Sequence, residues 1–273
     1  MTRHELTLRG IRISYLEVNP TANKTIIFIH GNSISSGFWE PQLSSPSLLG
    51  YRLLAPDLPA HGGSGRSADP EKDYTLPGLG AIMAEFASMV ISGPYITCGV
   101  SLGTNIQCEM IPHGLKPAGM FLAGSCVMGP GLGVDKVALP GADISVLLKD
   151  EATADEIGAY GAVVLQVPST NWSTRFVADF QEVKPPFRST FLPSVLAGNL
   201  SDEISLLKNA GIPLGWVFGA DERVVDIHYL DNVDMPKWGG VVHVLENAGH
   251  LVNNDAPEAF NVLLAAFIKE VLG

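Results

Sequence analysis

One serine of the chain lies between two glycines, in a pattern typical of an enzymatic nucleophile. Ser101 is the centre of Gly99-Val-Ser-Leu-Gly103, which follows the apolar run at residues 95–100 and precedes a segment with helical periodicity. Where a strand turns sharply into a helix, the residue in the turn is strained, and glycines two positions away let the neighbouring backbone approach. The pattern predicts that the Ser101 hydroxyl projects above a sheet, at the positive end of the following helix.

A serine hydroxyl is a poor nucleophile without a base, and suitable partners follow later in the chain. His250 comes after the apolar run at residues 241–245, and two adjacent acids, Asp221 and Glu222, come after the run at residues 214–218. A histidine oriented by a carboxylate is the usual base for such a serine. Loops that follow the C-terminal ends of parallel strands meet at one edge of a sheet, so the fold could bring these groups together. Either acid could accept a hydrogen bond from imidazole Nδ1, so both remain candidates.

The segment His30-Gly-Asn-Ser33 ends an early apolar run and supplies a further element. Negative charge that develops on a carbonyl oxygen is stabilised by two backbone N–H groups, one from the residue after the nucleophile and one from a loop after an early strand. We assign these groups to Leu102 and Asn32, with Gly31 permitting the close turn. His30 is predicted to be a buried histidine that fixes this loop. The chemistry requires no cofactor and no metal.

The elements that must position these residues follow from the hydrophobic pattern. Apolar runs typical of buried strands lie at residues 25–30, 51–56, 95–100, 118–123, 214–218 and 241–245, and residues 12–17 alternate as a half-exposed edge strand would. Helical periodicity covers residues 79–90, 105–111 and 256–272. Strands that alternate with helices predict an α/β fold with a mostly parallel central sheet flanked by helices.

The pattern changes between residues 124 and 212. Gly/Pro-rich turns and helical segments, including Thr153–Leu165, replace the buried strands. We interpret residues 124–212 as an inserted helical cap, or lid, on a core domain made of residues 1–123 and 213–273. The alternative is that these segments are further helices packed on the sheet.

Composition excludes several classes of protein. The chain has 273 residues, 46% of them hydrophobic, which is sufficient for a full core. A net charge of −11 without a basic cluster disfavours nucleic acid and anionic membrane surfaces as partners. The spacing of Cys98, Cys108 and Cys126 fits neither a zinc site nor a disulfide framework. With a charged N-terminus and no long apolar stretch, a cytoplasmic protein is expected.

These segments, in this order, resemble the α/β-hydrolase superfamily over essentially the whole chain. The segments His30–Gly37, Ala55–Gly62 and Ser101–Gly103 with Glu109 are similar to those of serine-dependent bacterial N-acyl homoserine lactone hydrolases. That resemblance implies an α/β-hydrolase fold and opening of a quorum-signal lactone, and it places the acid three residues after the loop glycine, at Glu222.

Three further residues are interpreted in the light of this resemblance. Val100 and Thr104 depart from the residues usual in the lactone hydrolases, and we expect them to reshape the floor of the pocket. Tyr160, on the predicted cap helix, is a candidate to hydrogen-bond a polar group of the substrate. Dehalogenases and epoxide hydrolases of the same fold need an aspartate at the position of Ser101, which argues against both activities.

The sequence therefore predicts a serine hydrolase that cleaves a small-molecule carboxylic ester or lactone through an acyl-enzyme, as a monomer or homodimer. Alternatives that keep the triad are a general carboxylesterase and a carbon–carbon (diketone) hydrolase. A further alternative is a hydrolase-like receptor that uses the pocket to bind a small molecule.

Overall fold

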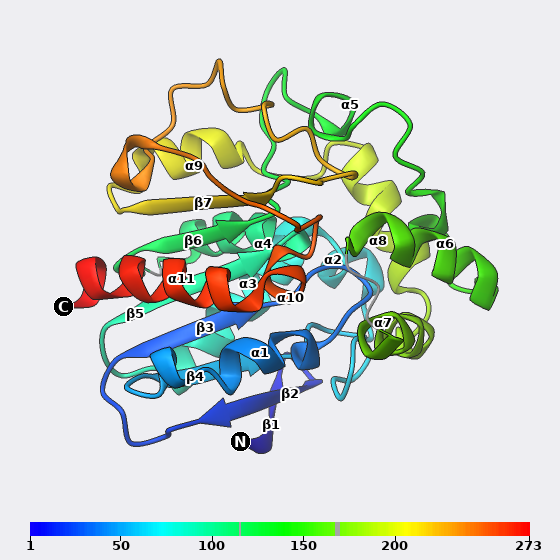
Figure 1. Ribbon diagram of the computed structural model, residues 1–273. Coiled ribbons are helices and arrows are strands. Elements are labelled where there is room, and N and C mark those ends of the chain that lie inside the picture. Colours follow the sequence, from blue (N-terminus) through cyan, green and yellow to red (C-terminus); the bar gives the residue numbers. More distant parts are fainter. Residues whose placement is uncertain (115, 167–169) are drawn as a thin grey trace.

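A single twisted sheet runs through the centre of the computed structural model (Figure 1). The structure describes residues 1–114, 116–166 and 170–273, and these residues form eight strands in the order β1-β2-β4-β3-β5-β6-β7-β8. The strands from β4 to β8 are parallel, and β1 and β2 join them antiparallel. Their bounds are Thr2–Leu8 (β1), Ile11–Val18 (β2), Thr25–Ile29 (β3), Arg52–Pro56 (β4), Tyr95–Val100 (β5), Met120–Ala123 (β6), Leu214–Gly219 (β7) and His243–Leu245 (β8).

The two edges of the sheet differ from the expectations. The edge strand beside β2 is β1, which sequence analysis had not predicted as a strand, because its alternating charged residues are typical of an exposed edge. Residues 12–17 therefore lie in the second strand, not at the edge. The predicted buried strand at residues 241–245 is reduced to the three residues of β8, and Val244 is 44% exposed because β8 forms the other edge.

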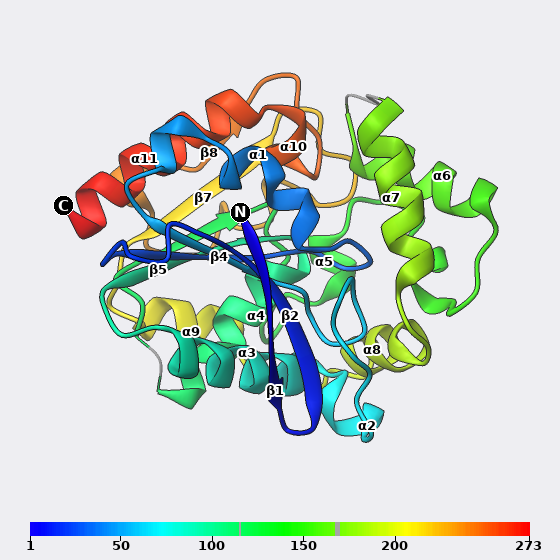
Figure 2. The same cartoon turned by 90° about the horizontal axis from the view of Figure 1, so that it is seen from below.

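Helices cover both faces of the sheet (Figure 2). One face carries α3 (Leu76–Val90), α4 (Leu102–Met110) and α9 (Glu203–Asn209), and the other carries α1 (Glu40–Leu43), α10 (Val252–Asp255) and α11 (Pro257–Leu272). The core lies between the sheet and these layers, where Phe28, Trp39, Phe121 and Phe267 are fully buried. Strands buried on both faces explain why β3 and β5 are continuous apolar runs.

The chain between β6 and β7 forms helices in the residues that the structure describes. It contains α5 (Val134–Val137), α6 (Ala154–Val164), α7 (Thr170–Glu182) and α8 (Phe187–Leu196), which gather beyond the C-terminal ends of the parallel strands, whereas α9 packs against α4 (Figure 1). A short helix, α2 (Pro70–Asp73), lies near α8. We propose that residues 124–212 form the cap and that α9 returns the chain to the core. Within the described ranges no helix is long and apolar enough to cross a membrane.

Candidate active site

Ser101 occupies the turn between β5 and α4 in a strained conformation. Its φ is 53° and its ψ is −124°, a region that residues with a side chain rarely adopt. The glycines on either side permit the turn: a Cβ on Gly103 would lie 2.1 Å from the carbonyl oxygen of Ile29, and one on Gly99 would lie 2.6 Å from the backbone of Gly103. The sharp turn raises the serine hydroxyl above the sheet, as predicted.

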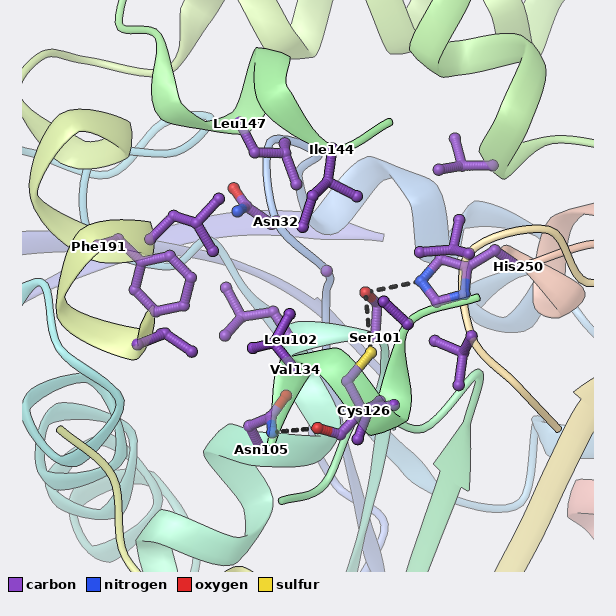
Figure 3. Close-up of a pocket in the computed structure, with 18 of the residues that line it drawn as sticks. Asn32, Ser101, Leu102, Asn105, Cys126, Val134, Ile144, Leu147, Phe191 and His250 are labelled. Atoms are coloured by element: carbon purple, nitrogen blue, oxygen red, sulfur yellow. Dashed lines mark hydrogen bonds between the residues drawn. The ribbon is translucent and has the colours of Figure 1, made fainter. Parts of the chain in front are cut away.

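Three side chains from three separate loops form one hydrogen-bonded chain. The Ser101 hydroxyl lies 2.8 Å from His250 Nε2, and His250 Nδ1 lies 2.8 Å from Glu222 Oε2 (Figure 3 draws the first of these bonds). The side chains of His250 and Glu222 are each 2% exposed. The second oxygen of Glu222, Oε1, accepts from the backbone N–H groups of residues 223, 224 and 225. Of the two candidate acids, the structure therefore brings Glu222 to the histidine and leaves Asp221 exposed.

Glu222 and His250 stabilise each other's charged forms. Burial alone would lower the pKa of His250, but the Glu222 carboxylate raises it, and the net shift is upward. Burial alone would raise the pKa of Glu222, but the imidazole and the backbone N–H donors lower it, and the net shift is downward. The site is therefore built to hold a positively charged imidazole beside a negatively charged carboxylate, which is the state that forms when a base takes a proton from serine.

The two predicted oxyanion residues flank the serine. Asn32 and Leu102 line the same cavity as Ser101, and in the described parts of the chain neither backbone N–H donates a hydrogen bond. His30 fixes the loop, as expected, because its Nδ1 donates to the Gly31 carbonyl and its Nε2 accepts from the N–H of residue 58. The pKa of His30 is lowered by burial, which favours the neutral form that this pattern needs.

An apolar cavity opens over the serine, beneath the helices between β6 and β7. Its walls are mostly aliphatic and aromatic, with Ile144 and Leu147 on the side of the inserted helices and Phe191 across the cavity from Ser101 (Figure 3). Tyr160 on α6 also lines the cavity and is largely buried. Burial raises the pKa of Tyr160, so the phenol stays protonated, and among the described residues its hydroxyl has no hydrogen-bond partner. Such a hydroxyl is free to bind a polar group of a ligand.

Cys126 is a site residue that sequence analysis had not connected with the serine. Its thiol lies 3.8 Å from the Ser101 hydroxyl and lines the cavity (Figure 3). The hydroxyl of Thr104 accepts from the N–H of Cys126 and donates to the carbonyl of Ser101. The expectation that Val100 and Thr104 reshape the pocket floor directly is not met, because both are buried and neither lines the cavity. Thr104 acts instead through the backbone of Cys126.

The chain matches the family model described as "Alpha/beta hydrolase family" over residues 26–262. It is also similar to solved structures of the N-acyl homoserine lactonase AidH. A variant complexed with N-hexanoyl homoserine lactone is 25% identical, covers 99% of this chain and 98% of its own, and has a TM-score of 0.91. AidH complexed with N-butanoyl homoserine is 26% identical, covers 99% and 97%, and also has a TM-score of 0.91. A putative aryl esterase from Burkholderia cenocepacia has the same fold at 20% identity, with 99% of each chain covered and a TM-score of 0.83.

The chain belongs to the α/β-hydrolase family. This confirms the fold and the resemblance derived from the motifs. The family identifies the chain as an α/β-hydrolase, and the lactonase structures are similar to it over almost its whole length.

Proposed function

We propose that this enzyme is a serine hydrolase that opens N-acyl homoserine lactones, with Ser101, His250 and Glu222 as its catalytic triad. The observation that carries the proposal is the hydrogen-bonded chain from Glu222 through His250 to Ser101, which ends beneath an apolar cavity. The choice of lactone is supported by the similarity to AidH across almost the whole chain.

The proposed reaction begins with attack of Ser101 Oγ on the lactone carbonyl carbon. His250 Nε2 takes the hydroxyl proton, and Glu222 stabilises the imidazolium and keeps Nδ1 protonated. The N–H groups of Asn32 and Leu102 donate to the carbonyl oxygen as it becomes negatively charged. The ring C–O bond then breaks, and the leaving alkoxide takes the proton from His250.

Hydrolysis of the acyl-enzyme completes the cycle. The freed hydroxyl remains attached to the acyl group, so the intermediate is an open-chain ester of Ser101. His250 takes a proton from water, and the resulting hydroxide attacks the ester carbonyl. The bond to Ser101 Oγ then breaks, and His250 returns the proton to Oγ, which restores the neutral serine and imidazole. The product is an N-acyl homoserine. We propose that the acyl chain occupies the apolar cavity and that the Tyr160 hydroxyl binds a polar group of the substrate, such as its amide.

Lactone opening releases a proton, so the proposal is tested by pH-stat titration. N-butanoyl and N-decanoyl homoserine lactone are supplied beside p-nitrophenyl butyrate to the wild-type enzyme and to Ser101→Ala. We expect both lactones to be opened, and Ser101→Ala to lose about 10⁴-fold or more in kcat while keeping its fold by circular dichroism. If the enzyme cleaves the ester but opens neither lactone, it is a carboxylesterase, and the lactone assignment is contradicted. An unchanged rate in Ser101→Ala would contradict the triad.

A further inference from the structure

The residue after the proposed oxyanion donor Asn32 has an unusual backbone. Ser33 is fully buried and has a φ of 60°, in the left-handed region that disfavours residues with a side chain. Its N–H donates to His61 Nε2 at 3.2 Å, and its hydroxyl donates to Oδ1 of Asn32 at 2.9 Å. The groups that stabilise this conformation of Ser33 therefore also fix the position of Asn32.

A cationic side chain from the region above the sheet contacts this serine. Arg188, the second residue of α8, donates from Nη1 to Ser33 Oγ at 3.4 Å. An arginine can only donate, so Ser33 Oγ accepts from Arg188 and uses its own proton for Asn32. The three residues form a directed chain from the guanidinium, through a hydroxyl, to the side chain of the proposed oxyanion residue.

The guanidinium of Arg188 is held rigidly. Three of its nitrogens donate to backbone carbonyl groups. Nε donates to Lys149 at 2.5 Å and Nη2 donates to Asp150 at 2.8 Å. Nη1, besides its bond to Ser33, donates to Phe180 at 2.9 Å. The ring of Phe180 lies 4.1 Å from the guanidinium carbon. A guanidinium has five N–H groups in one plane, and four of them donate hydrogen bonds here. These bonds fix the direction in which Nη1 points.

Burying the charged guanidinium of Arg188 is unfavourable for the free energy of folding. It is 2% exposed, and no described carboxylate lies within ion-pair distance of its guanidinium. Burial lowers the pKa of Arg188 to about 10, and the nearby Asp150 carboxylate only partly offsets this effect. A buried charge that is not fully compensated destabilises the fold, whereas an apolar side chain of similar size would fill the same space. This cost indicates a role beyond packing.

The residue before Arg188 supports the other hydrogen bond of Ser33. The ring of Phe187 packs edge-on against His61, with 4.4 Å between the ring centres. His61 Nδ1 donates to the carbonyl of Pro59, so its Nε2 is free of a proton and accepts from Ser33. Two consecutive residues at the start of α8 therefore support Ser33: Arg188 contacts its hydroxyl, and Phe187 packs against His61, which binds its N–H.

We propose that Arg188 is a positioning residue of the oxyanion hole, which acts through the Ser33 hydroxyl to hold Asn32 where it can donate to the developing oxyanion. The proposal rests on the proposed serine mechanism, but not on the choice of lactone as substrate. If Arg188 has this role, stabilisation of the oxyanion by the core domain depends on α8, a helix of the inserted segment.

The test compares Arg188→Met and Ser33→Ala with the wild-type enzyme, using p-nitrophenyl butyrate. A misplaced oxyanion donor weakens the transition state more than the bound ester, so we expect each variant to lower kcat about tenfold with KM changed less than about twofold. Because both residues act in one chain, the double variant is expected to be no slower than Arg188→Met alone. Ser33→Ala leaves Arg188 in place and keeps the test decisive if Arg188→Met folds poorly.

Arg175→Met is the matched control. Arg175 also links α7 to the core, through an ion pair with Glu40 at 3.0 Å, but its guanidinium packs against Gly37 and Phe38 and makes no hydrogen bond to residues 30–33 in the described parts of the chain. We expect this variant to retain the wild-type kcat. Equal losses in Arg175→Met and Arg188→Met, multiplying losses in the double variant, or a change confined to KM would each overturn the proposal.

A second measurement separates positioning from general damage. A thionoester offers sulfur in place of the carbonyl oxygen, and sulfur is a poor hydrogen-bond acceptor, so it gains little from an oxyanion hole. We expect Arg188→Met to lower kcat for the oxygen ester far more than for the matching thionoester, whereas equal losses for the two substrates would contradict positioning. Ser101→Ala distinguishes the two proposals: if it still cleaves the ester, the serine mechanism itself fails.

Discussion

Glu222 Oε2 lies 2.8 Å from His250 Nδ1, whereas Asp221, the adjacent residue in sequence, is exposed to solvent. The difference arises in the turn that follows β7, which leaves Asp221 at the surface and directs the next side chain toward His250. The three backbone N–H groups that bind the other oxygen of Glu222 keep the carboxylate ionised and oriented. Asp221 has none of these contacts and serves as a built-in control for Glu222.

Glu222→Gln is expected to lower kcat by about 10⁴-fold, because the amide no longer stabilises the imidazolium that forms during attack. Asp221→Asn removes the same charge one residue away and is expected to leave kcat within about twofold. Steady-state kinetics with p-nitrophenyl butyrate checks both. A comparable loss in the two variants would mean that net loop charge, not the contact with His250, sustains catalysis.

The pH dependence of the residual activity gives an independent check of the pair. In the proposed mechanism only neutral His250 can take the serine proton, so activity is expected to fall as pH decreases through the pKa of His250. Glu222 raises that pKa, so Glu222→Gln must lower it, and we expect the acidic limb of kcat/KM to move to lower pH. A limb that stays in place would show that another group controls it.

Tyr160→Phe tests recognition of the substrate. One lost hydrogen bond to a bound amide corresponds to about 1 kcal/mol, or a fall of about fivefold in kcat/KM for N-butanoyl homoserine lactone. The rate for p-nitrophenyl butyrate, which has no amide, should not change, because the phenyl ring keeps its packing against Phe176 and Phe180. Equal losses with both substrates would assign Tyr160 to packing alone.

Phe191 stands at the end of the cavity away from His250 (Figure 3). Shortening it to leucine opens space for additional methylene groups, each worth about 0.8 kcal/mol when buried. We expect Phe191→Leu to raise the ratio of kcat/KM for p-nitrophenyl octanoate over butyrate about tenfold. Phe267→Leu, a buried core position within α11, controls for lost packing and should leave this ratio unchanged. A ratio unmoved by Phe191→Leu would place the acyl chain elsewhere.

Thiol reagents should inactivate the enzyme through one cysteine. Cys126 is partly exposed in the cavity, whereas Cys98 and Cys108 are fully buried, and burial raises the pKa of both thiols. N-ethylmaleimide is expected to add once, at Cys126, and to block the serine 3.8 Å away. Mass spectrometry locates the adduct. Cys126→Ala should stay active and become resistant, and inactivation of this variant at the same rate would implicate another residue.

Most of the parallel sheet could be predicted because strands buried on both faces are continuous apolar runs. The edges could not be predicted as easily: β1 is mostly exposed, and its charged residues gave no hydrophobic signal. The positions of Ser101 and His250 were predictable from glycines and strand ends. The choice between Asp221 and Glu222 by the residues alone was not, because it depends on which side chain the loop turns inward.

Arg188 and Cys126 could not have been found from the sequence. A single arginine in a helical segment is typical of an exposed residue, and its burial depends on carbonyl groups of residues 149, 150 and 180 that only the fold brings together. Cys126 follows β6, and its proximity to Ser101 arises from the pairing of β5 with β6. Such relationships depend on tertiary structure and leave no local pattern.

The strained turn at Ser101 also lowers the thermal stability of the folded chain. A φ of 53° with a ψ of −124° costs a residue with a side chain about 1–3 kcal/mol, and glycine avoids most of this cost. Ser101→Gly is therefore expected to melt at a higher temperature than Ser101→Ala, although both lack the proposed nucleophile. We therefore expect selection for thermal stability alone to favour replacement of Ser101 by glycine, at the expense of the proposed activity.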